Sequence, residues 1–223
     1  MPKAIGIIMD GNRRWARSRN LPLLEGHRQG AEKLKDVARW SRDAGVQELT
    51  VYAFSTENWK RSEEEVSYLM KLLGQMLSKD LQELHKEHIQ LRFVGERDRF
   101  QPTLIEKMNE LERVVPLETK LTLVIALSYG GRAELTSAVN TLIERGVENV
   151  SEEDINRALW TNGLMDPDMV IRTGGEKRLS NFLPWQSVYS ELFFSETMWP
   201  EFSFEEFLSC IEAFRSRERR RGA

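Results

Sequence analysis

The chain has 223 residues, of which 40% are hydrophobic and 30% charged, and its formal net charge at pH 7 is -3. This composition is that of an ordinary globular protein, and the length predicts one domain over residues 1–223. Because the net charge is small and negative, the protein surface as a whole does not attract nucleic acid or an anionic membrane. An anion site must therefore come from locally gathered arginines.

Cysteine content and hydropathy narrow the class of protein further. Cys210 is the single cysteine, which excludes an internal disulfide and a cysteine-based zinc cluster and fits a reducing cytoplasm. No run reaches the roughly 18 to 20 apolar residues needed to span a bilayer, and residues 1–9 are too short for a signal peptide. We therefore expect a cytoplasmic protein that can act peripherally at a membrane on an amphipathic substrate.

Apolar runs rich in β-forming residues recur along the chain, and longer amphipathic stretches separate most of them. The predicted strands cover residues 4–9, 48–53, 89–94, 120–127, 168–172 and, less clearly, 191–194. Alternation of this kind is typical of an α/β fold with a mainly parallel sheet and helices on its faces.

Four helices are predicted between and after these strands. Residues 26–44 carry an apolar stripe that ends before Gly45. Ser62-Glu63-Glu64-Glu65 predicts a capping box, and a Leu- and Met-rich face follows it as far as Leu84. That face fits either plain core or the wall of a lipid tunnel. Residues 132–145 and 203–219 predict the other helices.

Ligands of an open parallel sheet bind beyond the carboxyl ends of its strands, so the segments after the predicted strands are informative. Four of them combine glycine or small hydroxyl residues with Arg, Lys or Asn, as a pocket for phosphate oxygens requires. These segments are residues 10–15, 54–61, 128–132 and 172–182. Each alone could be a solvated loop, but together they predict a polyanion site.

The first segment also carries a metal-ligand candidate. Asp10 offers the hard oxygen that Mg²⁺ prefers, and Gly11 lets the backbone approach a ligand closely. Asn12 supplies an amide, while Arg13 and Arg14 can pair with phosphate oxygens. The alternative is a strand followed by an Asx turn with solvated arginines. His27, near a helix start, is open to either a functional or a structural role.

Longer motifs resemble one known family over essentially the whole length. In chain order they are IIMDGNRRWA, GHRQGA, YAFSTENWKR, SYGGRAEL, IRTGGEKRLSNFLPWQ, YSEL and RERRRG. Together they resemble the cis-prenyltransferases of the undecaprenyl diphosphate synthase type. The resemblance implies a homodimer, a central six-stranded mainly parallel sheet flanked by helices, and an apolar tunnel for a growing isoprenoid.

The chemistry that this resemblance implies is Mg²⁺-dependent chain elongation. An allylic prenyl diphosphate loses diphosphate while C4 of isopentenyl diphosphate attacks its C1, and loss of a proton gives a new Z double bond. The implied product is undecaprenyl diphosphate, the cell-wall lipid carrier, which associates with the membrane; a shorter Z-prenyl diphosphate is the alternative. A non-catalytic lipid-binding subunit and a phosphotransferase with Asp10 as nucleophile are disfavoured, the latter because Asn12 replaces a second carboxylate.

Residue roles follow from the matching positions. Asp10 and Glu191 are implied Mg²⁺ ligands, and the implied catalytic residues are Asp10, His27, Ser55 and Asn58. Implied substrate contacts are Gly11, Asn12, Arg13, Arg14, Trp15, His27, Ser55, Thr56, Glu57, Trp59 and Arg61, together with Arg172, Arg178, Leu179 and Ser180. Within the tail 215–223, Arg220 and Gly222 are implied to reach a phosphate across the dimer.

Three positions depart from the family pattern. Arg13 stands where glycine is usual, Leu23 where arginine is common, and Lys177 where some members have histidine. Loss of a phosphate-binding arginine at position 23 should weaken allylic diphosphate binding. We expect Arg13 to supply the missing guanidinium.

Overall fold

The computed structural model describes residues 1–217, except for the side chains of residues 79, 80 and 82. Its centre is a six-stranded sheet with the order β3-β4-β2-β1-β5-β6. The strands are β1 (Ala4–Ile8), β2 (Glu48–Ser55), β3 (Ile89–Val94), β4 (Leu121–Tyr129), β5 (Met169–Arg172) and β6 (Glu191–Phe194). Every neighbouring pair is parallel, which confirms the predicted sheet.

Two strands run farther than their apolar patterns predict. Strand β2 continues to Ser55 and β4 to Tyr129, two residues beyond each prediction. Irregular register between Tyr52 and Ser55 lets both strands continue, although the regular alternation of side chains is lost there. The extension carries Ser55 to the edge of the sheet where ligands of parallel sheets bind.

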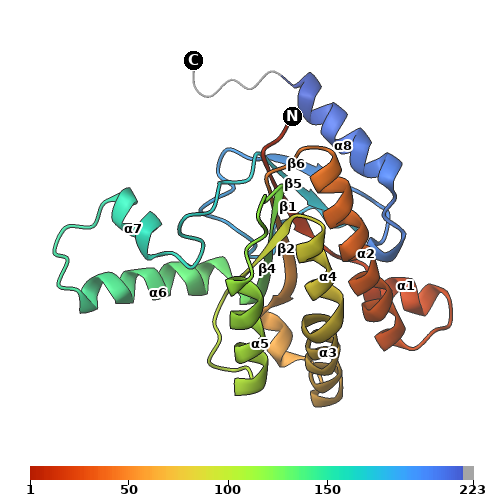
Figure 1. Cartoon of the computed structure of the whole chain (residues 1–223), viewed down its shortest axis with the longest axis horizontal. Coiled ribbons are helices and arrows are strands. Elements are labelled where there is room, and N and C mark those ends of the chain that lie inside the picture. The colour runs from red at the N-terminus through yellow and green to blue at the C-terminus, as the bar shows by residue number, and fades with distance from the viewer. Residues whose placement is uncertain (218–223) are drawn as a thin grey trace.

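Eight α-helices are described along the chain (Figure 1). They are α1 (Asn12–Ser18), α2 (Leu23–Asp43), α3 (Glu63–Gln75), α4 (Leu81–Lys86), α5 (Pro102–Arg113), α6 (Gly131–Glu144), α7 (Glu152–Ala158) and α8 (Phe204–Ser216). Short helical turns cover η1 (Thr56–Lys60), η2 (Met76–Asp80) and η3 (Trp199–Glu201). Within residues 1–217, no helix combines the length and apolar character that crossing a membrane requires.

The predicted helix boundaries differ from the structure in three places. Helix α2 begins at Leu23, directly after Pro22, because the fixed φ of proline suits a helix start. The segment predicted as a turn at residues 12–15 is the first part of α1. The long helix after Ser62 is interrupted by the π-helical turn η2, which hydrophobic periodicity cannot reveal.

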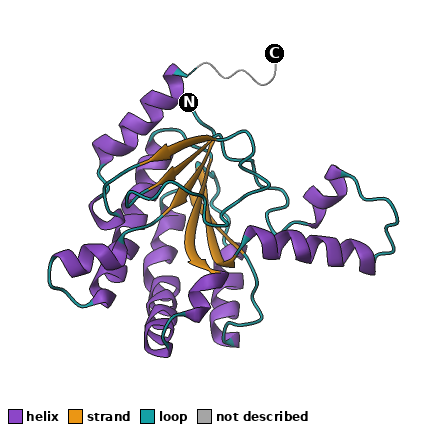
Figure 2. Cartoon of the chain, turned by 180° about the vertical axis from the view of Figure 1, so that it is seen from behind, coloured by secondary structure: helices purple, strands orange, loops and turns teal. Residues whose placement is uncertain are grey.

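The two faces of the sheet are covered differently. On one face, side chains of α2, α3, α4, α5 and α8 pack on alternate strand residues such as Ile7 and Leu123 in the larger core cluster. The other face forms a smaller cluster in which Ile8 and Val124 meet Phe182 and Leu183 from a loop. Helices α6 and α7 project away from the sheet (Figure 2). Helical cover is therefore concentrated on one face.

Strands β2, β1 and β5 are neighbours at the centre of the sheet. Their carboxyl ends lead to Ser55, Asp10 and Arg172, so three residues far apart in the sequence converge at one edge. The connection from β1 goes toward β2, whereas the chain later crosses to β5 on the other side. This reversal in strand order is where ligands of open parallel sheets bind.

At the opposite edge of the sheet, burial raises the pKa of Glu48 from its ordinary 4.5 to about 7. Its carboxylate accepts hydrogen bonds from the Met165 N–H at 3.1 and 3.3 Å. Because the folded chain holds this proton more tightly than the unfolded chain, the associated stability is present below pH about 4.5 and is lost as the pH rises to about 7.

Glu48→Gln carries no titrating proton at this position. We therefore expect the free energy of unfolding of the wild type to fall by about 2 kcal/mol relative to that of Glu48→Gln when the pH rises from 5 to 8. The free energy of unfolding, measured by urea titration at both pH values, checks this. Parallel pH dependence in the two proteins would contradict it.

Candidate active site

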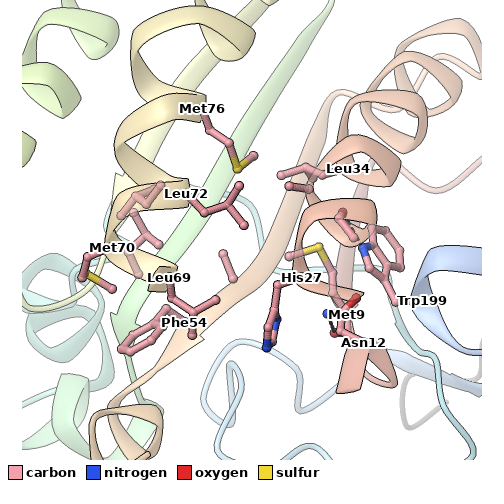
Figure 3. Close-up of a pocket in the computed structure, with 15 residues that line it drawn as sticks. Met9, Asn12, His27, Leu34, Phe54, Leu69, Met70, Leu72, Met76 and Trp199 are labelled. Atoms are coloured by element: carbon pink, nitrogen blue, oxygen red, sulfur yellow. Dashed lines mark hydrogen bonds between the residues drawn. The ribbon is translucent and has the colours of Figure 1, made fainter. Parts of the chain in front are cut away.

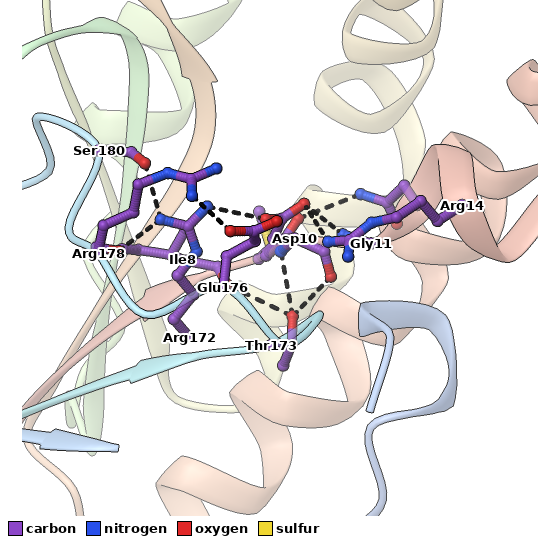
Figure 4. Close-up of polar contacts among 11 residues, drawn as sticks. Ile8, Asp10, Gly11, Arg14, Arg172, Thr173, Glu176, Arg178 and Ser180 are labelled. Atoms are coloured by element: carbon purple, nitrogen blue, oxygen red, sulfur yellow. Dashed lines mark hydrogen bonds and ion pairs between the residues drawn. The ribbon is translucent and has the colours of Figure 1, made fainter. Parts of the chain in front are cut away.

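An ion pair between Asp10 and Arg172 forms the centre of the site (Figure 4). Arg172 Nη2 donates to Asp10 Oδ2 at 2.8 Å, and Arg14 Nη2 lies 3.3 Å from Asp10 Oδ1. The Arg172 side chain is only 5% exposed, whereas 31% of the Asp10 side chain is exposed. Thr173 accepts from the Asp10 N–H at 3.0 Å and donates to the Asp10 carbonyl at 2.8 Å. The carboxylate is thus fixed in place while one side stays accessible.

Arg172 also organises the loop that follows β5. Its Nη1 donates to Ser180 Oγ at 2.7 Å and to the Arg178 carbonyl. Ser180 has a φ of 49°, so this loop turns back toward the strand that precedes it. The Arg178 side chain is exposed and pairs with Glu176. The backbone of this segment therefore brings a hydroxyl and two guanidinium groups to the same side of the sheet.

Two glycines allow the backbone to pass close to Asp10. Gly174 has a φ of +83°, and a Cβ there would lie 2.7 Å from Arg14 Nη2 and 3.1 Å from the Asp10 backbone. Gly11 has a φ of +108°, and a Cβ there would lie 2.9 Å from the Met198 backbone. Gly11 and Gly174 are therefore both needed for the close packing around Asp10.

Three adjoining cavities open at this edge. A cationic pocket of about 360 Å³ lies over α1, and a polar cleft of about 550 Å³ lies over the ends of β1, β2 and β5. The cationic pocket is lined by Met9, Asp10, Gly11, Asn12, Arg13, Arg14, Arg17, His27 and Arg61. Charged residues lining the polar cleft are Asp10, Glu57, Arg61 and Arg172, and its neutral polar residues include Ser55, Asn58, Ser180 and Asn181.

The third cavity, of about 100 Å³, is apolar and lies between α2, α3 and the sheet (Figure 3). Leu69, Met70 and Met76 line it from α3 and η2, opposite Leu34 of α2. The predicted Met- and Leu-rich face therefore serves two purposes: part of it fills the core, and part lines a cavity. Sequence alone leaves these alternatives open, because both require the same apolar face.

Met9, Asn12 and His27 line all three cavities and so mark their junction. Burial lowers the pKa of His27, and the nearby guanidinium of Arg61 lowers it further, which favours a neutral imidazole. His27 Nε2 lies 3.3 Å from Glu65 Oε1. A molecule bound in the cationic pocket would therefore have to extend past this imidazole to reach the apolar cavity.

Several implied site residues also hold neighbouring parts of the structure in place. Asn58 Oδ1 accepts from the Ser55 N–H at 3.0 Å and fixes the start of η1. Trp59 Nε1 donates to Ser128 Oγ at 2.9 Å, while Leu179 packs in the smaller core cluster. Implied contacts that line none of the three cavities are Trp15, Thr56, Trp59, Arg178 and Leu179.

Glu191 lies away from Asp10 within this chain. It begins β6 and pairs in register with Met169, whereas Arg172 pairs with Phe194 at the other end of the same strand. Its carboxylate forms an ion pair with Arg217. Arg220 and Gly222 lie outside the described residues. The structure therefore does not bring the two implied Mg²⁺ ligands together in one chain.

Sequence reasoning missed Glu65 and Arg17. Arg17 lies one helical turn after Arg13 and Arg14 and lines the cationic pocket. The carboxylate of Glu65 is buried against Arg61 and His27, although its position in the sequence predicts a role in a helix cap. The four-residue spacing of Arg61 and Glu65 was a signal that could have been used.

The residues around Asp10 fit a magnesium ion that is shared with a diphosphate. Among the side chains that the structure describes, no three from His, Cys, Asp or Glu are grouped to hold a metal ion by themselves. Mg²⁺ commonly takes one or two carboxylates and completes its coordination with phosphate oxygens and water. The accessible side of Asp10, beside a pocket rich in arginine, meets that requirement.

Comparison with known proteins agrees with this geometry. Residues 8–222 match the family model described as putative undecaprenyl diphosphate synthase. An isoprenyl transferase of Thermotoga maritima is 42% identical over 100% of this chain and 97% of its own length. The Micrococcus luteus ditrans,polycis-undecaprenyl-diphosphate synthase, (2E,6E)-farnesyl-diphosphate specific, is 43% identical over 100% of this chain and 92% of its own.

Solved structures give the same result. Lavandulyl diphosphate synthase from Lavandula x intermedia, in complex with dimethylallyl diphosphate, has a TM-score of 0.93 at 31% identity and covers 100% of this chain and 98% of its own. A probable undecaprenyl diphosphate synthase from Campylobacter jejuni has a TM-score of 0.84 at 33% identity, covering 100% and 99%. The chain therefore belongs to the undecaprenyl diphosphate synthase family of isoprenyl transferases and is a cis-prenyltransferase.

Proposed function

We propose that the protein condenses isopentenyl diphosphate with an allylic prenyl diphosphate in a Mg²⁺-dependent reaction that extends a Z-polyprenyl chain. The observation that carries this proposal is the position of the Asp10 and Arg172 ion pair, with a cationic pocket, a polar cleft and an apolar cavity meeting beside it. Two anionic head groups and one apolar tail need these three environments.

The cationic pocket suits the allylic diphosphate. Arg13, Arg14 and Arg17 lie on α1, and Arg61 reaches in from the end of η1. Guanidinium groups stabilise the negative charge that develops on the departing diphosphate, and they need no reorganisation if they are already in place. Bound Mg²⁺ would add Lewis-acid stabilisation of the same charge, with Asp10 as its ligand. Leu23 contributes no charge here, so Arg13 takes the place of a guanidinium from that position.

The polar cleft suits isopentenyl diphosphate. Arg172 and Ser180 are already hydrogen-bonded to each other there, and the exposed Arg178 lies on the same loop. The cleft adjoins the cationic pocket at Asp10 and His27. Binding of the two substrates in these adjoining sites would bring the nucleophilic C4 of one near the C1 of the other, which would lower the entropic part of the barrier.

The growing chain would enter the apolar cavity behind His27. Leucine and methionine side chains form most of that wall, and methionine adapts readily to the shape of a neighbour. We infer that the product is undecaprenyl diphosphate, used as a cell-wall lipid carrier and associated with the membrane, because relatives with that activity are similar over the full chain. A shorter Z-prenyl diphosphate is the second candidate, supported by the small volume of the apolar cavity, about 100 Å³.

We also infer a homodimer in which the edge strand β6 lies at the interface. Leu192 and Phe194 point outward from β6, and the preceding Val188 and Tyr189 are 67% and 75% exposed. An unpaired strand edge with an apolar surface favours association with another chain. Glu191 lies on this edge, so it would act in the active site of the second subunit.

The role of Asp10 can be tested by Asp10→Asn. The amide still accepts a hydrogen bond from Arg172 but loses the charge that holds Mg²⁺, so we expect turnover to fall by about 100-fold or more with Mg²⁺ present. Radiolabelled isopentenyl diphosphate with farnesyl, geranyl or longer starters gives both the rate and the product size. Asp98→Asn, an exposed aspartate, is the matched control, and near-normal turnover of Asp10→Asn would contradict the assignment.

The shared site can be tested by mixing two inactive variants. If Glu191 serves the second subunit, Asp10→Ala and Glu191→Ala, refolded together, form mixed dimers with one intact site. Random pairing then restores about a quarter of wild-type activity, because half of the dimers are mixed and each has one intact site. If the mixture is dimeric but regains no activity, Glu191 acts in the site of its own subunit. If sedimentation shows that the wild-type protein is a monomer, the proposed dimer is refuted.

A further inference from the structure

We propose that Glu65 is an internal counter-anion of the allylic diphosphate site, whose carboxylate pairs with Arg13, Arg61 and His27 until a diphosphate takes its place. The inference rests on the proposed function of the cationic pocket. It assigns to Glu65 a positioning role that limits how tightly the pocket holds diphosphate.

One oxygen of Glu65 faces all three groups. Arg61 Nη1 donates to Glu65 Oε1 at 2.8 Å, His27 Nε2 lies 3.3 Å from it, and Arg13 Nε lies at 3.8 Å. These groups come from α1, α2 and the residue after η1, and the Glu65 side chain is only 10% exposed. Tertiary structure therefore brings them together around one buried carboxylate.

Helix capping does not explain this position. Ser62 Oγ accepts from the Glu65 N–H at 3.4 Å, which is half of the capping box that the sequence predicts. In a complete box the glutamate side chain would turn back to the Ser62 N–H. The Glu65 carboxylate instead bonds Arg61 and approaches His27. Its neighbours Glu63 and Glu64 occupy the same helical turn and are exposed.

The three contacts of Glu65 differ in strength, and this difference affects how readily a diphosphate can replace the carboxylate. Arg13 is an ion-pair partner at 3.8 Å, and its Nε has no hydrogen-bond partner. Asp10, the carboxylate that lines the pocket itself, is already paired with Arg172. A diphosphate carries more charge and more acceptor oxygens than one carboxylate, so it competes successfully for the guanidinium groups of Arg13 and Arg61.

This competition has a function in a repeating reaction. Each cycle of elongation must expel inorganic pyrophosphate before the lengthened product can use the same pocket. A carboxylate that pairs again with the arginines lowers the free-energy cost of emptying the pocket, because the cations are not left unpaired. Removal of this carboxylate should make pyrophosphate bind more tightly and leave more slowly.

The test compares Glu65→Gln with Glu64→Gln, which removes the same charge from an exposed position on the same helical turn. Inorganic pyrophosphate is titrated calorimetrically into each protein without added metal. We expect Glu65→Gln to bind pyrophosphate about tenfold more tightly than the wild type, because a negative charge that repels the anion is lost. The affinity of Glu64→Gln should change by less than about twofold. In steady state, both KM for the allylic diphosphate and kcat should fall in Glu65→Gln, whereas structural damage would raise KM.

The outcomes separate this inference from the proposed function. If wild-type protein does not bind pyrophosphate, the assignment of the pocket fails, and the inference fails with it. If the wild type binds and Glu65→Gln binds equally or more weakly, only the role of Glu65 is overturned. Circular dichroism establishes folding first. If Glu65→Gln is unfolded, Glu65→Asp, whose shorter side chain withdraws the carboxylate, must give the same direction of change.

Discussion

The pairing of Asp10 with Arg172 depends on the parallel sheet. Strands β1 and β5 are neighbours in register, so Asp10, just beyond the end of β1, meets the last residue of β5, although 162 residues separate them. The almost completely buried guanidinium needs a counter-charge, and the carboxylate needs a fixed direction toward the cleft. This single interaction therefore links the stability of the central strands to the geometry of the proposed diphosphate site.

Sequence patterns predict those parts of the molecule that depend on local structure and on the rule for parallel sheets. The alternation of strands and helices gives the fold class, and the polar segments after residues 9, 53, 127 and 171 predict the ligand edge. Ser55, Arg172 and Ser180 were found in this way and lie beside Asp10 in the polar cleft. They could be predicted because the carboxyl ends of parallel strands must share an edge.

The remaining parts depend on tertiary geometry that one sequence does not contain. The π-helical turn η2 interrupts an apolar pattern that continues through it, so periodicity misplaces the end of α3. Glu65 satisfies the pattern of a helix cap, yet its carboxylate bonds across to other elements because α1 and α2 bring Arg13 and His27 within reach. The position of Glu191 follows from the register of β6, which its four residues do not specify.

The two carboxylates of the site have different tasks because their surroundings differ. Asp10 has an accessible side and a fixed partner in Arg172, so it can bind a cation without releasing that arginine. Glu65 is more buried, and its partners are the groups that a diphosphate would also bind. A site made only of arginines would bind diphosphate tightly and release it slowly. Turnover of an anionic leaving group therefore requires a balance between cations that stabilise its departure and a carboxylate that re-pairs with them afterwards.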